Sequence, residues 1–117
     1  MMNKLLLGKL IRKLRKNKGL SLRNLAEKVD ISFVNIAHIE NDRVKTSKKT
    51  IIQLAKALDH DVDELLAKAE TIGDDIEEII LKQPTALPAF LRSAKNLSAA
   101  QWNELTRQVE KINKKGI

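Results

Sequence analysis

Apolar residues recur along the first part of the chain at the spacing that places them on one face of a helix. Leu7, Leu10, Ile11 and Leu14 follow this spacing, and Gly19 stands just beyond them, where a helix commonly ends. The pattern predicts a helix over residues 3–17 that buries these four side chains. No stretch shows the sustained alternation of a strand, so the sequence predicts an all-α protein.

Four more helices are predicted before residue 70, and each begins after a residue that can accept a hydrogen bond from the first turn. Ser21, Ser32 and Ser47 are the expected caps of the second, third and fourth helices, and the third ends near Asn41. The fifth begins with a D-x-x-E capping box at residues 61–64. The predicted inward faces carry Leu22, Leu25, Ala26, Val29, Ile36, Ile39, Ile51, Leu54, Ala55, Leu58, Val62, Leu65 and Leu66.

Residues 71–73 mark the expected boundary between a domain at 1–70 and a short helical segment at 71–117. In this segment a helix is expected over residues 74–81, the Gln-Pro pair at 83–84 ends it, and Pro88 is expected to open the next. Ser98 and Gln101 form a further capping box. The helix that follows carries an apolar stripe of Trp102, Leu105, Val109 and Ile112. Because a segment of about 45 residues rarely forms a stable core alone, we expect the stripe to be covered.

Composition narrows the class of function. The chain has 117 residues, no cysteine and two histidines, so a disulfide framework, a thiol nucleophile and a Cys-ligated zinc site are excluded. His38 and His60 have no further ligands near them in sequence, and no nucleophile has a neighbouring base, so neither a metal, another cofactor nor an enzyme is expected. No apolar run suits a signal peptide or a membrane span, which predicts a cytoplasmic protein.

The formal charge of +7 is distributed unevenly. Residues 1–49 hold 13 basic and 4 acidic side chains, residues 50–80 hold 2 and 9, and residues 81–117 hold 7 and 2. A basic block beside an acidic one suggests a surface for a polyanion such as nucleic acid. The alternative is that the lysines serve only solubility.

The segment LRNLAEKVDISFVNIAHIEN, residues 22–41, has the features that a helix-turn-helix requires. Ala26 is small enough for two helices to cross closely, and residues 29–32 can form the tight turn. On a helical wheel Ile36 and Ile39 define the buried side of the third helix. The outward side then carries Phe33, Val34, Ala37, His38 and Asn41.

Exposed apolar side chains on a basic domain suggest contact with DNA bases. In the major groove Phe33 and Val34 would contact thymine methyl groups, Asn35 would pair with adenine, and His38 would donate to guanine or to a phosphate. Two alternatives remain open from the sequence: Phe33 folds back into the core, or His38 is merely solvated.

Four stretches of the chain resemble the lambda-repressor-like (XRE-type, Cro-type) helix-turn-helix family. They are LGKLIRKLRKNKGLS, LAEKVDIS, IAHIEN and TIIQLAKALDHDVDELL, which lie between residues 7 and 66 and cover about half of the chain. The resemblance implies a five-helix DNA-binding domain whose third helix, residues 32–41, enters the major groove. It also implies phosphates at the N-termini of the second and fourth helices and at the loop after the third.

The resemblance implies roles for individual residues. Its base-reading positions are Ser32, Phe33, Val34, Asn35 and His38, and its phosphate-contacting positions are Ser21, Arg23, Asn41, Arg43, Lys45, Lys48 and Lys49. Arg15 and Glu40 match a structural ion pair between the first helix and the end of the third. The chain departs from the family pattern at Leu22, where glutamine is frequent, at Asp30 and Asp42, where glycine is frequent, and before Ser47, where proline is missing.

Lys48 and Lys49 provide a separate indication, because a positive charge in a first turn opposes the helix dipole by ~0.3–1 kcal/mol. A phosphate bound there would turn this cost into a gain, whereas screening by salt is the alternative.

These observations predict a sequence-specific regulator of transcription, most simply a homodimeric repressor of double-stranded DNA, because such domains bind two half-sites ~34 Å apart. The expected dimer surface comprises Phe90, Leu91, Trp102, Leu105, Val109 and Ile112. Two alternatives place this stripe on the fourth and fifth helices or on a different protein. The second would make the chain an antitoxin or a partner-binding adaptor.

Overall fold

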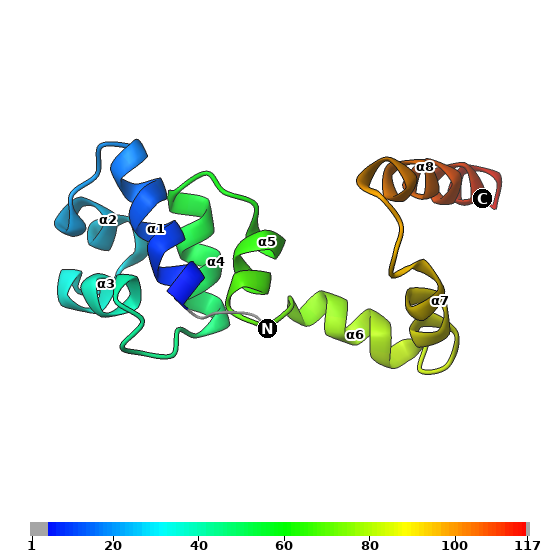
Figure 1. The fold of residues 1–117 in the computed structure, drawn as a ribbon, viewed down its shortest axis with the longest axis horizontal. Coiled ribbons are helices and arrows are strands. Elements are labelled where there is room, and N and C mark those ends of the chain that lie inside the picture. Colours follow the sequence, from blue (N-terminus) through cyan, green and yellow to red (C-terminus); the bar gives the residue numbers. More distant parts are fainter. Residues whose placement is uncertain (1–4, 117) are drawn as a thin grey trace. The chain divides into compact units, whose positions relative to one another are not determined.

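The computed structural model describes residues 5–116, and over that range the chain forms helices and no strand, which confirms the predicted all-α class (Figure 1). The predicted start of the first helix at Asn3 lies outside the described residues. The chain divides into two compact units, Met1–Glu77 and Glu78–Ile117. The helices are α1 (Leu5–Asn17), α2 (Leu22–Val29), α3 (Phe33–Glu40), α4 (Lys48–Ala57), α5 (Val62–Lys68), α6 (Asp74–Lys82), α7 (Ala86–Ala94) and α8 (Ala99–Lys115).

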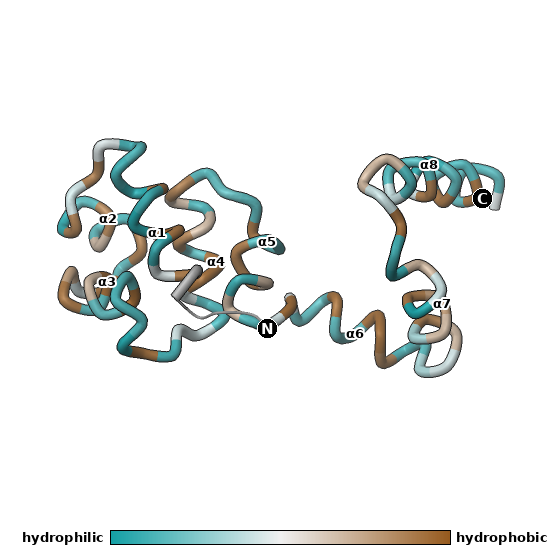
Figure 2. Tube along the Cα trace, in the orientation of Figure 1, coloured by the Kyte–Doolittle hydropathy of each residue, from teal (hydrophilic) through white to brown (hydrophobic). Residues whose placement is uncertain are grey.

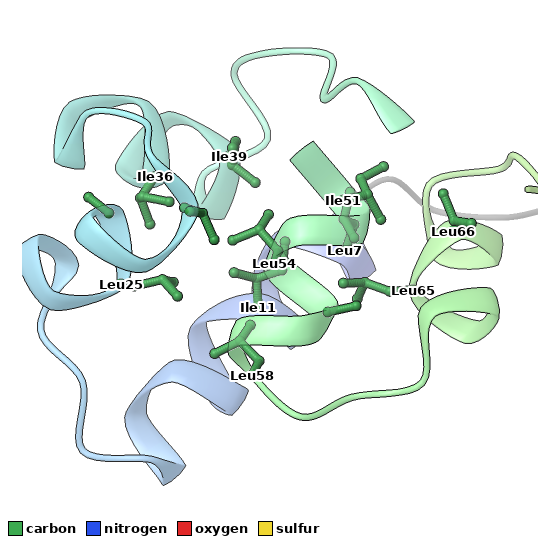
Figure 3. Close-up of a cluster of buried hydrophobic side chains, with 13 residues drawn as sticks. Leu7, Ile11, Leu25, Ile36, Ile39, Ile51, Leu54, Leu58, Leu65 and Leu66 are labelled. Atoms are coloured by element: carbon green, nitrogen blue, oxygen red, sulfur yellow. The ribbon is translucent and has the colours of Figure 1, made fainter. Parts of the chain in front are cut away.

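The first unit is built around an aliphatic core to which α1–α5 all contribute (Figure 3). α4 packs against α2 and α5, and α1 packs against α3 and α5. Most residues of the predicted inward faces are buried, and Leu10, Leu14, Leu22 and Val62 are half-buried. Seven of these residues have no exposed surface: Ile11, Leu25, Ile36, Ile51, Leu54, Ala55 and Leu65. Full burial of a leucine or isoleucine side chain contributes about 1.5–3 kcal/mol, so this core sets the positions of α2 and α3.

The predicted caps define where the helices begin. The hydroxyl oxygens of Ser21, Ser32 and Ser47 accept hydrogen bonds from backbone N–H groups three residues later, at 3.0–3.2 Å. Asp61 accepts in the same way at the start of α5, at 2.8 Å. Each bond satisfies one of the N–H groups that a helix leaves without an internal partner.

The five helices of the first unit end in the same way. Each is followed by a left-handed residue with φ between 53° and 70°, and only the first of these is glycine: Gly19, Asp30, Asp42, Asp59 and Glu70. The next N–H then donates to the carbonyl five residues earlier, as from Leu20 to Arg15 and from Thr71 to Leu66. This is the Schellman arrangement, and Asp30 and Asp42 adopt it although glycine has no steric cost there.

Gly8 lies where α1 crosses the end of α3. A Cβ atom at this position would lie 2.8 Å from the carbonyl oxygen of Ile39 and against the carbonyl oxygen of Glu40. The missing side chain therefore permits the backbones of the two helices to approach each other.

The division between the units falls after Glu77, beyond the boundary predicted after residue 70. The cause is the first turn of α6, where Asp74 and Glu77 both accept hydrogen bonds from Lys48 of α4. This turn belongs to the first unit, and the sequence pattern contained no signal for its attachment.

The second unit has little buried surface of its own. Ala94 is its only buried residue among those described, and the rings of Phe90 and Trp102 meet edge to face with centroids 6.4 Å apart. The capping box of Ser98 and Gln101 is formed in both directions, as predicted. Figure 2 shows apolar and polar positions alternating along α8.

The predicted start of α7 at Pro88 is wrong, because the helix begins at Ala86. Pro88 is its third residue, where the missing N–H costs nothing because a helix has no acceptor for the N–H groups of its first turn.

Within the described part of the chain, no helix combines the length and the apolar character that crossing a membrane requires.

Candidate nucleic-acid interface

The helices α2 and α3 are held at a fixed angle by their buried faces and by the turn between them. Ala26 and Val29 of α2 and Ile36 of α3 are buried in the core. Asp30 caps α2 in the left-handed conformation, with φ 55° and ψ 42°, and Ile31 N–H donates to Ala26 at 3.3 Å. Three residues thus reverse the chain, which leaves the outer side of α3 uncovered by α2.

The N-terminal half of α3 presents the residues predicted to read bases. Ser32, Phe33, Val34 and Asn35 are exposed, and His38 is half-buried one turn further on. Phe33 is 39% exposed and Val34 48%. Phe33 therefore does not fold back into the core, and the exposed apolar pair is present where the helical wheel placed it.

Phe33 makes a contact that the sequence reasoning missed. The guanidinium carbon of Arg23, in the first turn of α2, lies 4.5 Å from the centroid of the Phe33 ring. This is within the range of a cation–π interaction. The sequence pattern assigns Arg23 to a phosphate contact and Phe33 to a base contact, and ten positions separate them in the chain. Only their shared location at two adjacent helix N-termini could have indicated the pair.

The cations predicted to contact phosphate differ in their surroundings. Arg43 and Lys45 in the loop after α3 and Lys49 in the first turn of α4 are exposed. Lys48, by contrast, donates to Glu77 Oε1 at 2.7 Å and to Asp74 Oδ1 at 3.0 Å. These hydrogen bonds, first that to Glu77 and then that to Asp74, raise the pKa of Lys48. Lys48 is thus directed towards α6.

Two polar groups predicted to contact phosphate are already engaged within the protein. The Asn41 side-chain amide donates to the Ala37 carbonyl at 2.9 Å, and its oxygen accepts from Arg12 at 3.0 Å. The Ser21 hydroxyl caps α2 and also donates to the side-chain oxygen of Asn24. Their contribution to a DNA contact is therefore limited to the hydrogen-bonding capacity that remains.

Arg15 and Glu40, which the sequence paired, lie together in the buried junction of α1 and α3. Arg15 donates through Nε to Glu40 Oε2 at 2.6 Å and through Nη2 to Oε1 at 3.0 Å, and Arg12 adds a third bond to Oε1 at 3.2 Å. The hydrogen bond to Glu40 raises the pKa of Arg15. Because Arg15 and Glu40 are buried and both carboxylate oxygens are occupied, this ion pair fixes the end of α3 and is not available to DNA.

The residues predicted to form the dimer surface all lie in the second unit. Phe90, Leu91, Trp102, Val109 and Ile112 are exposed, and Leu105 is half-buried. No group of three or more metal-binding side chains is found among the described residues.

Comparison with known proteins identifies the class. Residues 11–65 match the model of a family described as helix-turn-helix, which is consistent with a lambda-repressor-like, XRE-type helix-turn-helix domain. The predicted resemblance is thereby confirmed. A search among curated proteins finds no match.

A solved structure extends the similarity beyond the matched domain. The chain is similar to a chain of a structure described as the SinR protein/SinI protein complex, with 25% sequence identity and a TM-score of 0.50. The similarity covers 92% of this chain and 98% of that one. The similarity therefore extends over most of the second unit as well.

Proposed function

We propose that this protein is a homodimeric repressor that recognises a specific double-stranded DNA sequence with α3 in the major groove. The observation that supports it is the exposed N-terminal face of α3. There Phe33 and Val34 offer apolar contacts and Asn35 a bidentate amide, on a helix whose opposite face is held by the core. Apolar side chains are costly on a basic surface unless they contact something apolar, and thymine methyl groups are the apolar feature of the major groove.

In this proposal the bases are read by Ser32, Phe33, Val34, Asn35 and His38. Arg23, Arg43, Lys45 and Lys49, which are exposed, supply the phosphate contacts. Ser21 and Asn41 contribute less, because their side chains are already engaged. Lys48 contributes only when it leaves the carboxylates of α6. Phosphate contacts position the domain, and base contacts select the sequence.

The second unit supplies the dimer contact in this proposal. Its stripe of Trp102, Val109 and Ile112 is exposed in a unit that has almost no core of its own. Covering the stripe with a second copy would bury this apolar surface and would place two α3 helices on two half-sites, a spacing of ~34 Å or a multiple of it. Repression then follows from occupation of a promoter by the dimer.

The experiment is a selection of bound sequences from random duplex DNA with the full chain at about 150 mM salt, where electrostatic binding is already weakened. We expect enrichment of a two-fold symmetric motif with half-sites near one helical turn. Salt-sensitive binding without enrichment of any motif would contradict sequence-specific recognition.

A second candidate function is that of a partner-binding adaptor, such as an antitoxin, in which the second unit binds a different protein. The similar solved chain belongs to a complex between two proteins, SinR and SinI, and this observation favours the candidate. It predicts that the chain purifies from its own host with a stoichiometric partner, and that this partner reduces DNA binding. A homodimer in the host without any such partner would contradict it.

A further inference from the structure

The pairing of Arg23 with Phe33 is the feature of the interface that neither the sequence reasoning nor the helix-turn-helix class accounts for. Arg23 is the second residue of α2 and Phe33 the first of α3, so the contact joins the N-termini of the two helices. Both side chains are exposed, which means that packing in the core does not force them together. The contact is therefore formed between two surface side chains without support from the core.

A carboxylate that could form an ion pair with Arg23 lies nearby on the same helix, and the ion pair is not formed. Glu27 follows Arg23 by four positions on α2, the spacing at which opposite charges commonly pair on a helix. Both residues line the same hollow of about 500 Å³ beside the turn, together with Asp30, Ser32 and Phe33. Among the described residues, Arg23 forms no ion pair, and its guanidinium lies over the Phe33 ring instead.

Stacking leaves the binding capacity of the guanidinium intact. The guanidinium carbon lies over the ring, and in the described part of the chain Arg23 donates no side-chain hydrogen bond to another protein group. A guanidinium has five N–H donors in a planar fork that matches two phosphate oxygens. A guanidinium held in this way also loses less side-chain freedom when it binds. An ion pair with Glu27 would have the opposite effect, because it would occupy the same donors.

We propose that Phe33 is a positioning residue for Arg23: its ring holds the guanidinium away from Glu27 and in the orientation that binds a DNA phosphate. The phosphate is favoured over a base edge because Arg23 lies on the first helix of the motif, which crosses the DNA backbone, whereas the second helix enters the groove. This inference rests on the proposed function and refines it: among the residues proposed to read bases, Phe33 instead supports a phosphate contact, and Val34 and Asn35 keep the base-reading role.

The test is a double-mutant cycle with Arg23→Ala, Phe33→Leu and both together, measured as affinity for the selected operator at several salt concentrations. We expect Phe33→Leu to weaken binding by about threefold to tenfold, since a cation–π contact of this strength is lost. In the Arg23→Ala background the same change should have no effect. Arg23→Ala should reduce the slope of log affinity against log salt by about one unit.

The control for unchanged affinity is Lys56→Ala, at an exposed position outside the proposed interface. Phe33→Tyr keeps the aromatic face and should preserve the coupling to Arg23→Ala, whereas leucine keeps only the apolar character. Since Phe33 is exposed, neither change removes core contacts, and circular dichroism checks the fold. In the free protein, the side-chain protons of Arg23 should show an upfield ring-current shift by NMR that Phe33→Leu abolishes.

Three results would overturn the inference. The first is an additive cycle with intact wild-type binding, which would mean that Phe33 acts on DNA directly. The second is a loss of affinity on replacing thymine by uracil in the operator that disappears in Phe33→Leu but persists in Arg23→Ala, which would identify a thymine contact. The third is the absence of the ring-current shift. If the wild-type chain itself bound no duplex, the proposed function would fail and this inference with it.

Discussion

Gly8 is the residue whose identity the packing of α1 on α3 restricts most directly. Helix propensity alone predicts that Gly8→Ala stabilises the chain, because glycine within a helix costs about 1 kcal/mol relative to alanine. The added Cβ would lie 2.8 Å from the Ile39 carbonyl oxygen, and a backbone oxygen cannot move aside as a flexible side chain can. We expect the clash to prevail and Gly8→Ala to lower the free energy of unfolding by about 1–3 kcal/mol, measured by urea denaturation.

The matched control for this prediction is Gly116→Ala. Gly116 has a φ of −78°, and an added Cβ would approach the Ile112 carbonyl oxygen only to 3.3 Å at the end of α8. We expect no significant change there. An increase in stability for Gly8→Ala would show that the two helices have room to separate.

Substitutions at two residues of the proposed interface should distinguish base reading from phosphate binding. Asn35→Ala should weaken binding to the operator by ~1–3 kcal/mol and leave non-specific binding nearly unchanged. Lys49→Ala should weaken binding to all duplexes alike and reduce the salt slope by about one unit. Lys56→Ala, at the other end of α4, is the control. An equal loss on operator and random DNA for Asn35→Ala would remove this residue from the base-reading set.

At the scale of elements, a surface ion pair joins the turns that follow α1 and α4. Lys18 Nζ lies 2.5 Å from Asp59 Oδ2, and this hydrogen bond is the main cause that lowers the pKa of Asp59 below its ordinary value of 3.8. A carboxyl group whose pKa is lower in the folded state than in the unfolded state stabilises the folded protein at pH values above its ordinary pKa. That contribution is lost as the pH falls through the lowered value.

We therefore expect Lys18→Met to reduce the urea midpoint near neutral pH and to have no effect below the folded-state pKa of Asp59. The Asp59 carboxyl signal should titrate below 3.8 in the wild type and return towards 3.8 in the variant, as followed by NMR. Lys16→Met, at an exposed position in the last turn of α1, is the control. A difference between wild type and Lys18→Met that is independent of pH would contradict this account.

The left-handed helix ends provide a second test at this scale. Glu70 adopts φ 60° after α5, a conformation that is unfavourable for a residue with a Cβ. Its charge also lies at the negative end of the helix dipole. We expect Glu70→Gly to raise the free energy of unfolding by about 0.5–1 kcal/mol, in calorimetry. Glu70→Ala, which removes the charge and keeps the Cβ, should gain less. Equal gains in both variants would assign the whole effect to the charge.

The helices of the first unit could be predicted from the sequence because their signals are local. Ser21, Ser32 and Ser47 cap within three residues, and the inward faces repeat with the helical period. The start of α7 was misplaced because proline is tolerated at any position of a first turn, so Pro88 does not specify which.

The parts of the site that could not be predicted are contacts between side chains far apart in the sequence. The hydrogen bonds of Lys48 to α6, of Asn41 to Arg12 and the stack of Arg23 on Phe33 each join two elements. Each depends on the relative placement of those elements, and side-chain type alone does not specify it. The exposed positions on α3 follow from the helical period, and for this reason they could be predicted.

At the scale of the whole molecule, the two units differ in how much apolar surface they bury. The first has a core of leucine and isoleucine, whereas the second leaves Val109 49% and Ile112 67% exposed. Protein segments of this size are rarely stable without further contacts. The integrity of the second unit is therefore expected to depend on what covers α8.

Ile112→Glu tests the proposed dimer at this scale. A charge within an apolar contact would have to be desolvated, so we expect sedimentation to change from a dimer to a monomer and operator affinity to fall. Asn103→Glu introduces the same charge on the other side of α8 and should leave the dimer intact. A dimer that persists in Ile112→Glu would remove this stripe from the interface.

The edge-to-face contact of Phe90 with Trp102 has a practical consequence. Trp102 is the only tryptophan in a chain without tyrosine, so its fluorescence reports on the second unit alone. Circular dichroism, in contrast, is dominated by the helices of both units. Coincident unfolding curves from the two signals would mean that both units unfold as one cooperative system. Separate curves, with only the fluorescence transition shifting with protein concentration, would mean that assembly stabilises the second unit independently of the first.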